Sequence, residues 1–365
     1  MAKVVEFLSG RFAAAGLLLC TLILGVYGMG RSLWLDEAWV ANSINAPTLH
    51  GMFIYPDWLQ TSPPLFLLLA RWAVGVFGLS DVSLRLVPLL LALLAVAGML
   101  AVARRVVSAP LAVLACAALA FHPTAVEYFR SVKQYSGEVA ATTLVLLVTI
   151  RYLQSPKRKQ FYWLLGVVAV AMPLSYPTVF LLAGVLWAIR HDARRSAVLV
   201  AVSGSMLAIL YWWFIRPNVS SALQVYWSAE GRDLWMPVAT GLAAAGVVAV
   251  AALPRFGIRG RLAIVCALPF IPFAIAEAAG WYPQSPRTSL FLRPCLLLVL
   301  VMAAAEVTKN WRRPAVDLAV TLLAILTVVL GMRKQFHEGR FQPEEDFAGV
   351  VRYLSKNVGP TDIVL

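Results

Sequence analysis

The sequence predicts an all-α polytopic membrane protein with about 11 transmembrane helices. Of its 365 residues, 61% are apolar and 13% are charged, whereas soluble domains have about 45–50% apolar and about 25% charged residues. The mean hydropathy is +0.78. The apolar residues also fall into blocks of about 20, the length that crosses a bilayer core of roughly 30 Å. These observations exclude a soluble enzyme and a disordered chain.

The predicted spans are apolar blocks that lie between charged residues. In chain order they are residues 12–29, 83–103, 108–126, 137–153, 161–177, 178–190, 196–215, 237–253, 261–279, 288–305 and 314–331. The first block is longer than the core of a signal peptide and has no clean small-x-small cleavage site, so we expect it to be a retained helix. All four cysteines lie in apolar runs, and their spacing does not indicate zinc.

The block from Pro63 to Gly78 decides the topology, because it is short for a span and has Arg71 near its middle. Cytoplasmic loops collect Lys and Arg. If the block does not cross and the N-terminus is inside, 17 cations lie inside and nine lie in the outer loops before the C-terminal segment. If it crosses, the two numbers exchange. We therefore predict a juxtamembrane helix in a long first extracytoplasmic loop, residues 30–82.

The net charge of +13 comes from 31 Lys and Arg against 18 Asp and Glu. On the predicted topology the inner side carries this whole excess and the outer side is neutral. The basicity is therefore interpreted as an orientation signal, with membrane lipids as partners and no nucleic acid. We expect a multi-pass protein of the cell (inner or plasma) membrane.

Two domains are predicted. Residues 1–331 form the transmembrane domain, and residues 332–365 form an extracytoplasmic C-terminal segment. Within that segment, residues 344–357 have the pattern of an amphipathic helix and residues 361–365 that of a strand. The segment is interpreted either as the start of a truncated soluble domain or as an unusually short domain.

Two adjacent carboxylates, Asp36 and Glu37, open the first outer loop between Trp34 and Trp39. A carboxylate within hydrogen-bond reach of a reacting hydroxyl can accept its proton. The alternative is a solvated acidic pair at the N-terminus of a short helix, where negative charge is favourable. Residues 36–44 are predicted to form such a short interfacial helix.

Cations and tyrosines lie near the outer membrane surface at two places. The second outer loop contains Arg130, Lys133 and Tyr135, and Arg287 and Arg293 flank the outer end of the tenth predicted span. Arg binds phosphate bidentately and Lys binds it as a point charge. The alternative is anchoring to lipid headgroups, which any interfacial cation can do.

Four motifs in order resemble the GT-C membrane glycosyltransferases. They are the acidic pair, the Pro-Pro-Leu-Phe helix that begins at Pro63, the Gly-x-Ser-Asp-x-Ser-x-Arg-Leu-x-Pro sequence of residues 78–88, and the Arg-x-x-Lys-Gln-Tyr-Ser loop of residues 130–136. The chain is most similar to the bacterial branch that resembles protein O-mannosyltransferases, lipid A aminoarabinose transferase and lipopolysaccharide galacturonosyltransferases. The resemblance is strongest over residues 30–140.

The resemblance implies an enzyme that transfers a sugar from a polyprenyl-phosphate donor to a glycolipid, polysaccharide or protein on the extracytoplasmic face, with inversion. It implies that Asp36 is the base and that Glu37 supports it. The predicted ligands of the donor phosphate are Arg130, Lys133, Tyr135 and Arg293, with Arg287 a weaker candidate. A divalent metal is possible, because some members of the family use one and others do not.

One departure from the family pattern concerns the phosphate. The aminoarabinose transferases have a lysine directly before the proline of the juxtamembrane helix, whereas this chain has Ser62. The donor phosphate must then depend on other cations. Two alternatives remain open: a flippase or transporter of a lipid-linked sugar, and a non-catalytic subunit of a glycan assembly complex.

Overall fold

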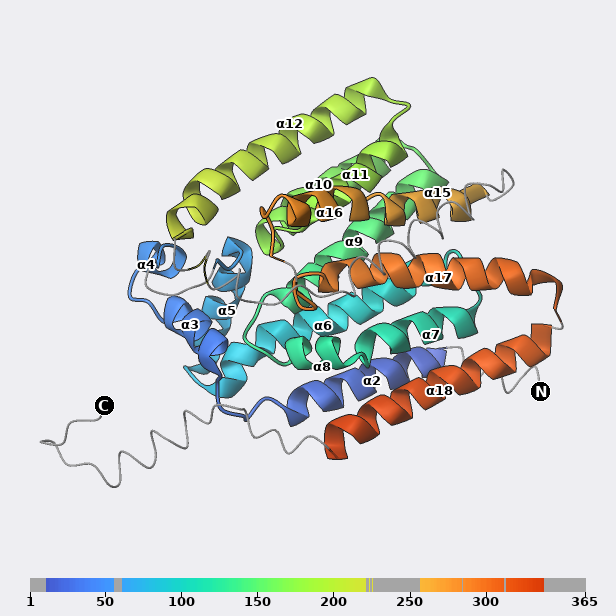
Figure 1. Ribbon diagram of the computed structural model, residues 1–365, viewed down its shortest axis with the longest axis horizontal. Coiled ribbons are helices and arrows are strands. Elements are labelled where there is room, and N and C mark those ends of the chain that lie inside the picture. The colour runs from blue at the N-terminus through green and yellow to red at the C-terminus, as the bar shows by residue number, and fades with distance from the viewer. Residues whose placement is uncertain are drawn as a thin grey trace, which may run out of the picture.

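The computed structural model describes residues 11–55, 61–220, 223, 225, 257–283, 285–311 and 313–337. Within these ranges every regular element is a helix, and the helices form one elongated bundle (Figure 1). The long helices are α2 (Arg11–Tyr27), α6 (Asp81–Ala103), α9 (Tyr135–Gln154), α10 (Arg158–Leu174), α12 (Ala193–Leu210), α17 (Arg293–Val307) and α18 (Arg313–His337). Shorter helices are α3 (Leu35–Ile44), α4 (Leu49–Phe53), α5 (Pro64–Phe77), α7 (Ala109–Ala120), α8 (Pro123–Phe129), α11 (Thr178–Ile189), α15 (Gly257–Ala267) and α16 (Phe270–Ala278).

The described residues contain six helical stretches that are long and apolar enough to cross a membrane. They are Asp81–Ala103, Tyr135–Gln154, Ala193–Asn218, Gly257–Ala278, Leu290–Val307 and Pro314–Phe336. The helices α7 and α8, bent by 67° at their break, make a seventh if they form one span. The prediction of an all-α polytopic fold is confirmed. The count of 11 stays a prediction, and the span at residues 237–253 and the segment at 338–365 lie outside the described residues.

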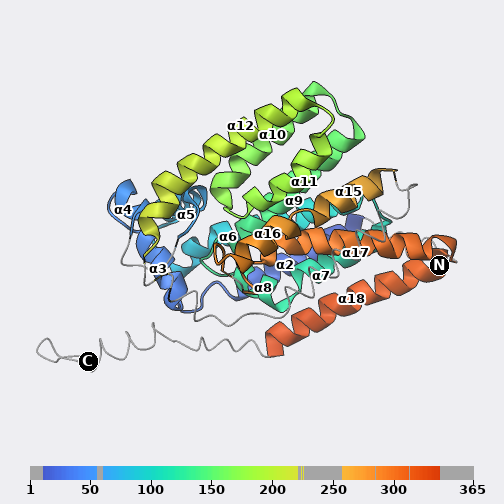
Figure 2. The ribbon, with the colours of Figure 1, turned by 45° about the horizontal axis from the view of Figure 1, so that its top comes forward.

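The centre of the bundle is the pair α6 and α9 (Figures 1 and 2). The helix α6 begins with a capping box, in which the side chains of Ser80 and Ser83 each accept a hydrogen bond from the other's backbone N–H. The two helices approach closely because Gly98 has no side chain: a Cβ there would lie 2.5 Å from Thr143 Oγ1. Small residues allow such close contacts between membrane helices.

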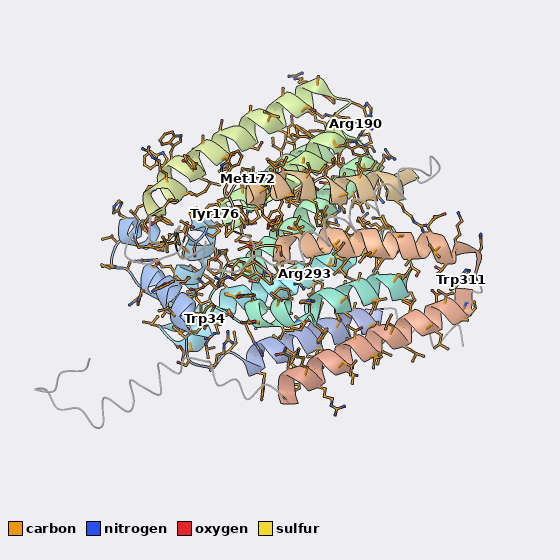
Figure 3. All side chains as sticks on the ribbon, viewed as in Figure 1. Trp34, Met172, Tyr176, Arg190, Arg293 and Trp311 are labelled. Carbon is orange, nitrogen blue, oxygen red and sulfur yellow. The ribbon has the colours of Figure 1, made fainter. Side chains whose placement is uncertain are left out.

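The two ends of the bundle carry different groups. At one end the cations of the predicted inner loops make contacts with neighbouring segments: Arg105 with Gln154 at 3.1 Å, Arg195 with Tyr152 at 3.0 Å, and Arg259 with the Val106 carbonyl at 2.6 Å. Figure 3 shows Arg190 and Trp311 toward this end and Trp34 toward the opposite end, where α3 and α4 lie. The orientation of these ends in a membrane stays a prediction.

The predicted first outer loop, residues 30–82, contains the two helices that the sequence predicts there. Its short helix is α3, and the juxtamembrane helix is α5, which has 14 residues. At 1.5 Å per residue such a helix is about 21 Å long, less than the roughly 30 Å of a bilayer core. Arg71 of α5 donates hydrogen bonds to the carbonyls of Ile44 and Ala46, at 3.4 and 2.6 Å, and so caps the C-terminal end of α3.

Asn218, the last residue of the helical stretch Ala193–Asn218, connects this loop to that stretch. Its side-chain amide donates to the carbonyls of Phe53 and Phe214, at 2.7 and 2.8 Å, and its Oδ1 accepts from the Tyr55 N–H at 2.9 Å. Ser62 continues the connection, because its N–H donates to the Tyr55 hydroxyl at 3.3 Å and its carbonyl accepts from the Tyr176 hydroxyl at 3.2 Å. These bonds position the segment that precedes α5.

Candidate active site

The acidic pair lies in the first turn of α3, where the positive end of the helix dipole favours carboxylates. Asp36 is 4% exposed and Glu37 is fully buried. Adjacent residues on a helix face different directions, so the two carboxylates bind different partners. The pair is therefore neither solvated nor equivalent, in contrast to the alternative interpretation of the sequence.

Glu37 forms a buried ion pair with Arg85 near the start of α6. Its Oε2 accepts from Arg85 Nη2 at 2.8 Å, and its Oε1 accepts from Arg85 Nε at 3.2 Å. Glu37 also accepts from the backbone N–H of Val132 at 2.7 Å and of Trp34 at 3.4 Å. The Arg31 guanidinium lies 3.6 Å away. Glu37 thus joins the start of α3 to α6 and to the loop that precedes α9.

All five N–H donors of the Arg85 guanidinium have an acceptor. Besides the two bonds to Glu37, Nη1 donates to the carbonyls of Met29 and Arg31, at 2.9 and 2.7 Å, and Nη2 donates to the Ser32 carbonyl at 3.2 Å. A buried ion pair needs such additional hydrogen bonds to offset its desolvation. The arrangement fixes the chain between α2 and α3, and with it the position of Asp36.

Asp36 is paired with two cations from distant parts of the chain. Its Oδ2 accepts from Arg287 Nη1 at 2.7 Å and lies 3.3 Å from Lys133 Nζ. Lys133 is in the loop that Glu37 holds through Val132. Arg287 is in a turn in which Ser285 and Thr288 each accept a hydrogen bond, through their side-chain oxygens, from the other's backbone N–H. Three segments from distant parts of the chain therefore place these groups together.

The buried groups of this Asp36 cluster carry an excess of positive charge, because one buried carboxylate contacts two buried cations. The exposed Glu127 of α8 also interacts electrostatically with Arg287. Both cations are 5% exposed. Burial lowers the pKa of Lys133, and the negative charge of Asp36 partly opposes this effect. A buried positive excess attracts an anion with several oxygens, such as a phosphate.

Tyr135 also belongs to this neighbourhood. It is 3% exposed, and its ring packs edge-to-face against Tyr128 with 4.8 Å between the centroids. Its hydroxyl interacts electrostatically with Arg287 and Asp36. The structure therefore brings four of the predicted site residues together: Asp36, Lys133, Tyr135 and Arg287.

Two other predicted phosphate ligands are held by different elements. Arg130 is fully buried, and its Nη2 donates to Gln335 Oε1 of α18 at 2.8 Å. Burial lowers the pKa of Arg130 to about 10. Arg293 begins α17 (Figure 3), and its Nη2 donates to Thr124 Oγ1 at 3.5 Å. Their role in phosphate binding stays a prediction.

The pairing of Arg85 with Glu37 and that of Arg287 with Asp36 were not predicted from the sequence. A signal existed for Arg85, because a lone cation at the start of an apolar span is costly unless it has a partner. Arg287 had no comparable signal, since 251 residues separate it from Asp36. Among the described residues, no three His, Cys, Asp or Glu side chains are grouped so that they could hold a metal ion.

Residues 61–219 match the family described as dolichyl-phosphate-mannose-protein mannosyltransferase. The fold is similar to that of ArnT from Cupriavidus metallidurans bound to undecaprenyl phosphate, with a TM-score of 0.54 and 17% sequence identity over 85% of this chain and 62% of that chain. The resemblance to the GT-C membrane glycosyltransferases is confirmed. The apo state of the same ArnT gives a TM-score of 0.52 and 18% identity over 84% of this chain and 61% of that one.

The GT-C-like chain spans about three fifths of the length of the ArnT chain. No curated protein sequence matches it. The family match contains Arg85 and Lys133 but neither Asp36 nor Arg287. Asp36 and Arg287 therefore lie outside the matched region, and the fold brings both of them close to Lys133, which lies inside it.

Proposed function

We propose that this chain is an integral membrane glycosyltransferase that transfers a sugar from a polyprenyl-phosphate donor to an acceptor on the extracytoplasmic face of the cell membrane. The acceptor class is a hydroxyl-bearing glycolipid, polysaccharide or protein. The observation that carries the proposal is the buried Asp36 cluster, in which one carboxylate faces Lys133 and Arg287. The similarity to ArnT bound to undecaprenyl phosphate supports a lipid-phosphate donor.

The proposed reaction is an inverting displacement at the anomeric carbon of the sugar. The acceptor oxygen forms the new bond to this carbon, and its proton moves to a carboxylate oxygen of Asp36. The bond between the anomeric carbon and the phosphate oxygen breaks, and its electron pair stays on the phosphate. The products are the glycosylated acceptor and the polyprenyl phosphate.

The donor phosphate binds to Lys133 and Arg287 in this proposal, with the Tyr135 hydroxyl beside them. Phosphate oxygens and the Asp36 carboxylate compete for the same two cations. Binding of the donor therefore releases Asp36 to accept a proton, while the cations stabilise the charge that develops on the leaving phosphate. Glu37 acts through Arg85 and Val132 as a positioning residue.

The test compares Asp36→Asn with Asp81→Asn in proteoliposomes that contain a synthetic radiolabelled polyprenyl-phosphate sugar and an envelope extract as acceptor. Asp81 has the same chemical type and lies at the start of α6, and it serves as the matched control. We expect loss of transfer of about 10²-fold or more in Asp36→Asn, from the usual range for general acid–base catalysis, and normal transfer in Asp81→Asn.

Full transfer by a correctly inserted Asp36→Asn protein would overturn the role of the base. Movement of the labelled lipid across the membrane without any new glycosidic bond would instead support the flippase alternative. Loss of a single sugar from the envelope glycans of cells that lack the protein, measured by mass spectrometry, would identify the donor sugar and the acceptor together.

A further inference from the structure

Two buried acceptor oxygens at the start of α9 are not used by the proposed reaction. They are Oε1 of Gln134 and Oε2 of Glu138, and neither has a hydrogen-bond partner among the described residues. Gln134 is the N-cap residue and has helical backbone angles, and its carbonyl accepts from the Glu138 N–H at 3.0 Å. The two side chains are four residues apart on a helical turn, so they lie on one face.

Burial of the Glu138 carboxyl group costs free energy of folding. The residue is 2% exposed, and no ion pair to a cation is found for it in the part of the chain that the structure describes, unlike Asp36 and Glu37. A buried polar group without a partner costs roughly 1–3 kcal/mol, and more when it is charged. Buried groups of this kind are rare in native proteins and require an explanation. A ligand that donates hydrogen bonds would provide one.

Glu138 is close to the Asp36 cluster. Tyr135 interacts electrostatically with Glu138 as well as with Asp36 and Arg287. On its other side Glu138 interacts with Tyr282, which packs against Phe180 and Phe273 with centroid distances of 5.4 and 5.6 Å. Glu138 thus borders the site at which the donor phosphate is proposed to bind, and Gln134 lies between Lys133 and Tyr135 in the chain.

We propose that Gln134 and Glu138 form the subsite that recognises the transferred sugar, by accepting hydrogen bonds from its hydroxyl or amino groups. This inference rests on the proposed function. The Cβ atoms of residues four apart on a helix are about 5–6 Å apart, so the two acceptors can reach two different groups of one sugar ring. Because both are acceptors and Glu138 has no partner cation, the subsite favours neutral and amino sugars and disfavours uronic acids.

The experiment measures binding by the purified full chain in detergent. The probes are undecaprenyl phosphate and synthetic undecaprenyl-phosphate sugars that carry a neutral hexose, an amino sugar or a uronic acid. The variant Glu138→Gln keeps the shape and removes the acidity, and Asp81→Asn is the matched control. We expect Glu138→Gln to bind undecaprenyl phosphate as the wild type does, to bind the hexose and amino-sugar donors roughly tenfold more weakly, and to discriminate less against the uronic acid.

Equal binding of every sugar donor by Glu138→Gln and the wild type would overturn the inference and leave the proposed function intact. A parallel loss of undecaprenyl phosphate binding would also overturn it, because the role of Glu138 would then be structural. If the wild type binds no sugar donor more tightly than undecaprenyl phosphate, the inference fails, because the sugar ring then gains nothing from Gln134 and Glu138. If it binds none of these lipid phosphates, the proposed function fails as well. A second variant, Glu138→Leu, removes the unpartnered acceptor and is expected to unfold at a higher temperature than the wild type while losing the preference among sugars.

Discussion

Replacing Glu37 by Gln is the sharpest test of the two roles that the structure gives to the acidic pair. Gln has the size of Glu but only one acceptor oxygen and no charge. Glu37 uses both oxygens: Oε1 accepts from Val132 N and Arg85 Nε, and Oε2 accepts from Arg85 Nη2 and Trp34 N. An amide group in place of Oε2 would point N–H bonds at the N–H donors of Arg85 and Trp34.

The expected cost of Glu37→Gln follows from this geometry. Both side chains of the Glu37–Arg85 pair are 0% exposed, and removing one partner of a buried pair costs about 3–5 kcal/mol. Native domains are stable by about 5–15 kcal/mol in total, so this change removes a large share. It should also loosen the loop of Lys133, because the Val132 bond depends on the same carboxylate.

The assay is unfolding by guanidinium in detergent, followed by the fluorescence of the 12 tryptophans, for the wild type, Glu37→Gln and Asp36→Asn. We expect Glu37→Gln to lose about 3–5 kcal/mol whether or not an anion is present. Asp36→Asn should recover stability when undecaprenyl phosphate is added, because the phosphate can bind the two cations that Asp36 released. A Glu37→Gln protein that is as stable as the wild type but inactive would refute this reasoning and make Glu37 a chemical participant.

Two further predictions concern the phosphate site and the bundle. Because burial lowers the pKa of Lys133 below its ordinary 10.5, its affinity for undecaprenyl phosphate should fall as the pH rises through this lowered value. Lys133→Arg should move the fall to higher pH, and unchanged titrations of binding against pH would contradict this. A Cβ at Gly184 would lie 2.2 Å from the Val265 carbonyl oxygen, so Gly184→Ala should lower the unfolding temperature. Gly204→Ala, which meets nothing within 4 Å, is its matched control and should not lower it.

The sequence was sufficient to predict most of the described helices, because each needs only local information. The length of an apolar block predicts a span, and the proline at the start of α5 predicts where that helix begins. The sequence was not sufficient to predict where a predicted span is divided into two helices. Predicted spans such as 108–126 are divided in the structure, because His122 and Pro123 interrupt the chain between α7 and α8.

The candidate site could be predicted in part. Asp36, Lys133 and Tyr135 stand next to apolar blocks in the sequence, where charged and polar residues are unusual enough to be noticed. The pairing of Asp36 with Arg287 depends on how distant helices pack, and no local pattern contains that information. The different partners of Asp36 and Glu37 were not predictable either, because they depend on which distant residues pack against each of two adjacent side chains.

The charged groups around the proposed reaction centre lie in an order that matches the phosphate and the sugar ring of a lipid-linked sugar. Glu37 and Arg85 neutralise each other and leave no charge for a substrate. Lys133 and Arg287 exceed the single charge of Asp36, which favours the donor phosphate. Glu138, beyond Tyr135, is an acceptor without a cation and favours the hydrogen-bond donors of the sugar. A phosphate held by Lys133 and Arg287 and a ring held by Glu138 would leave the anomeric carbon between these groups. Inversion then requires the acceptor oxygen to approach this carbon from the side opposite the phosphate, within hydrogen-bond reach of Asp36.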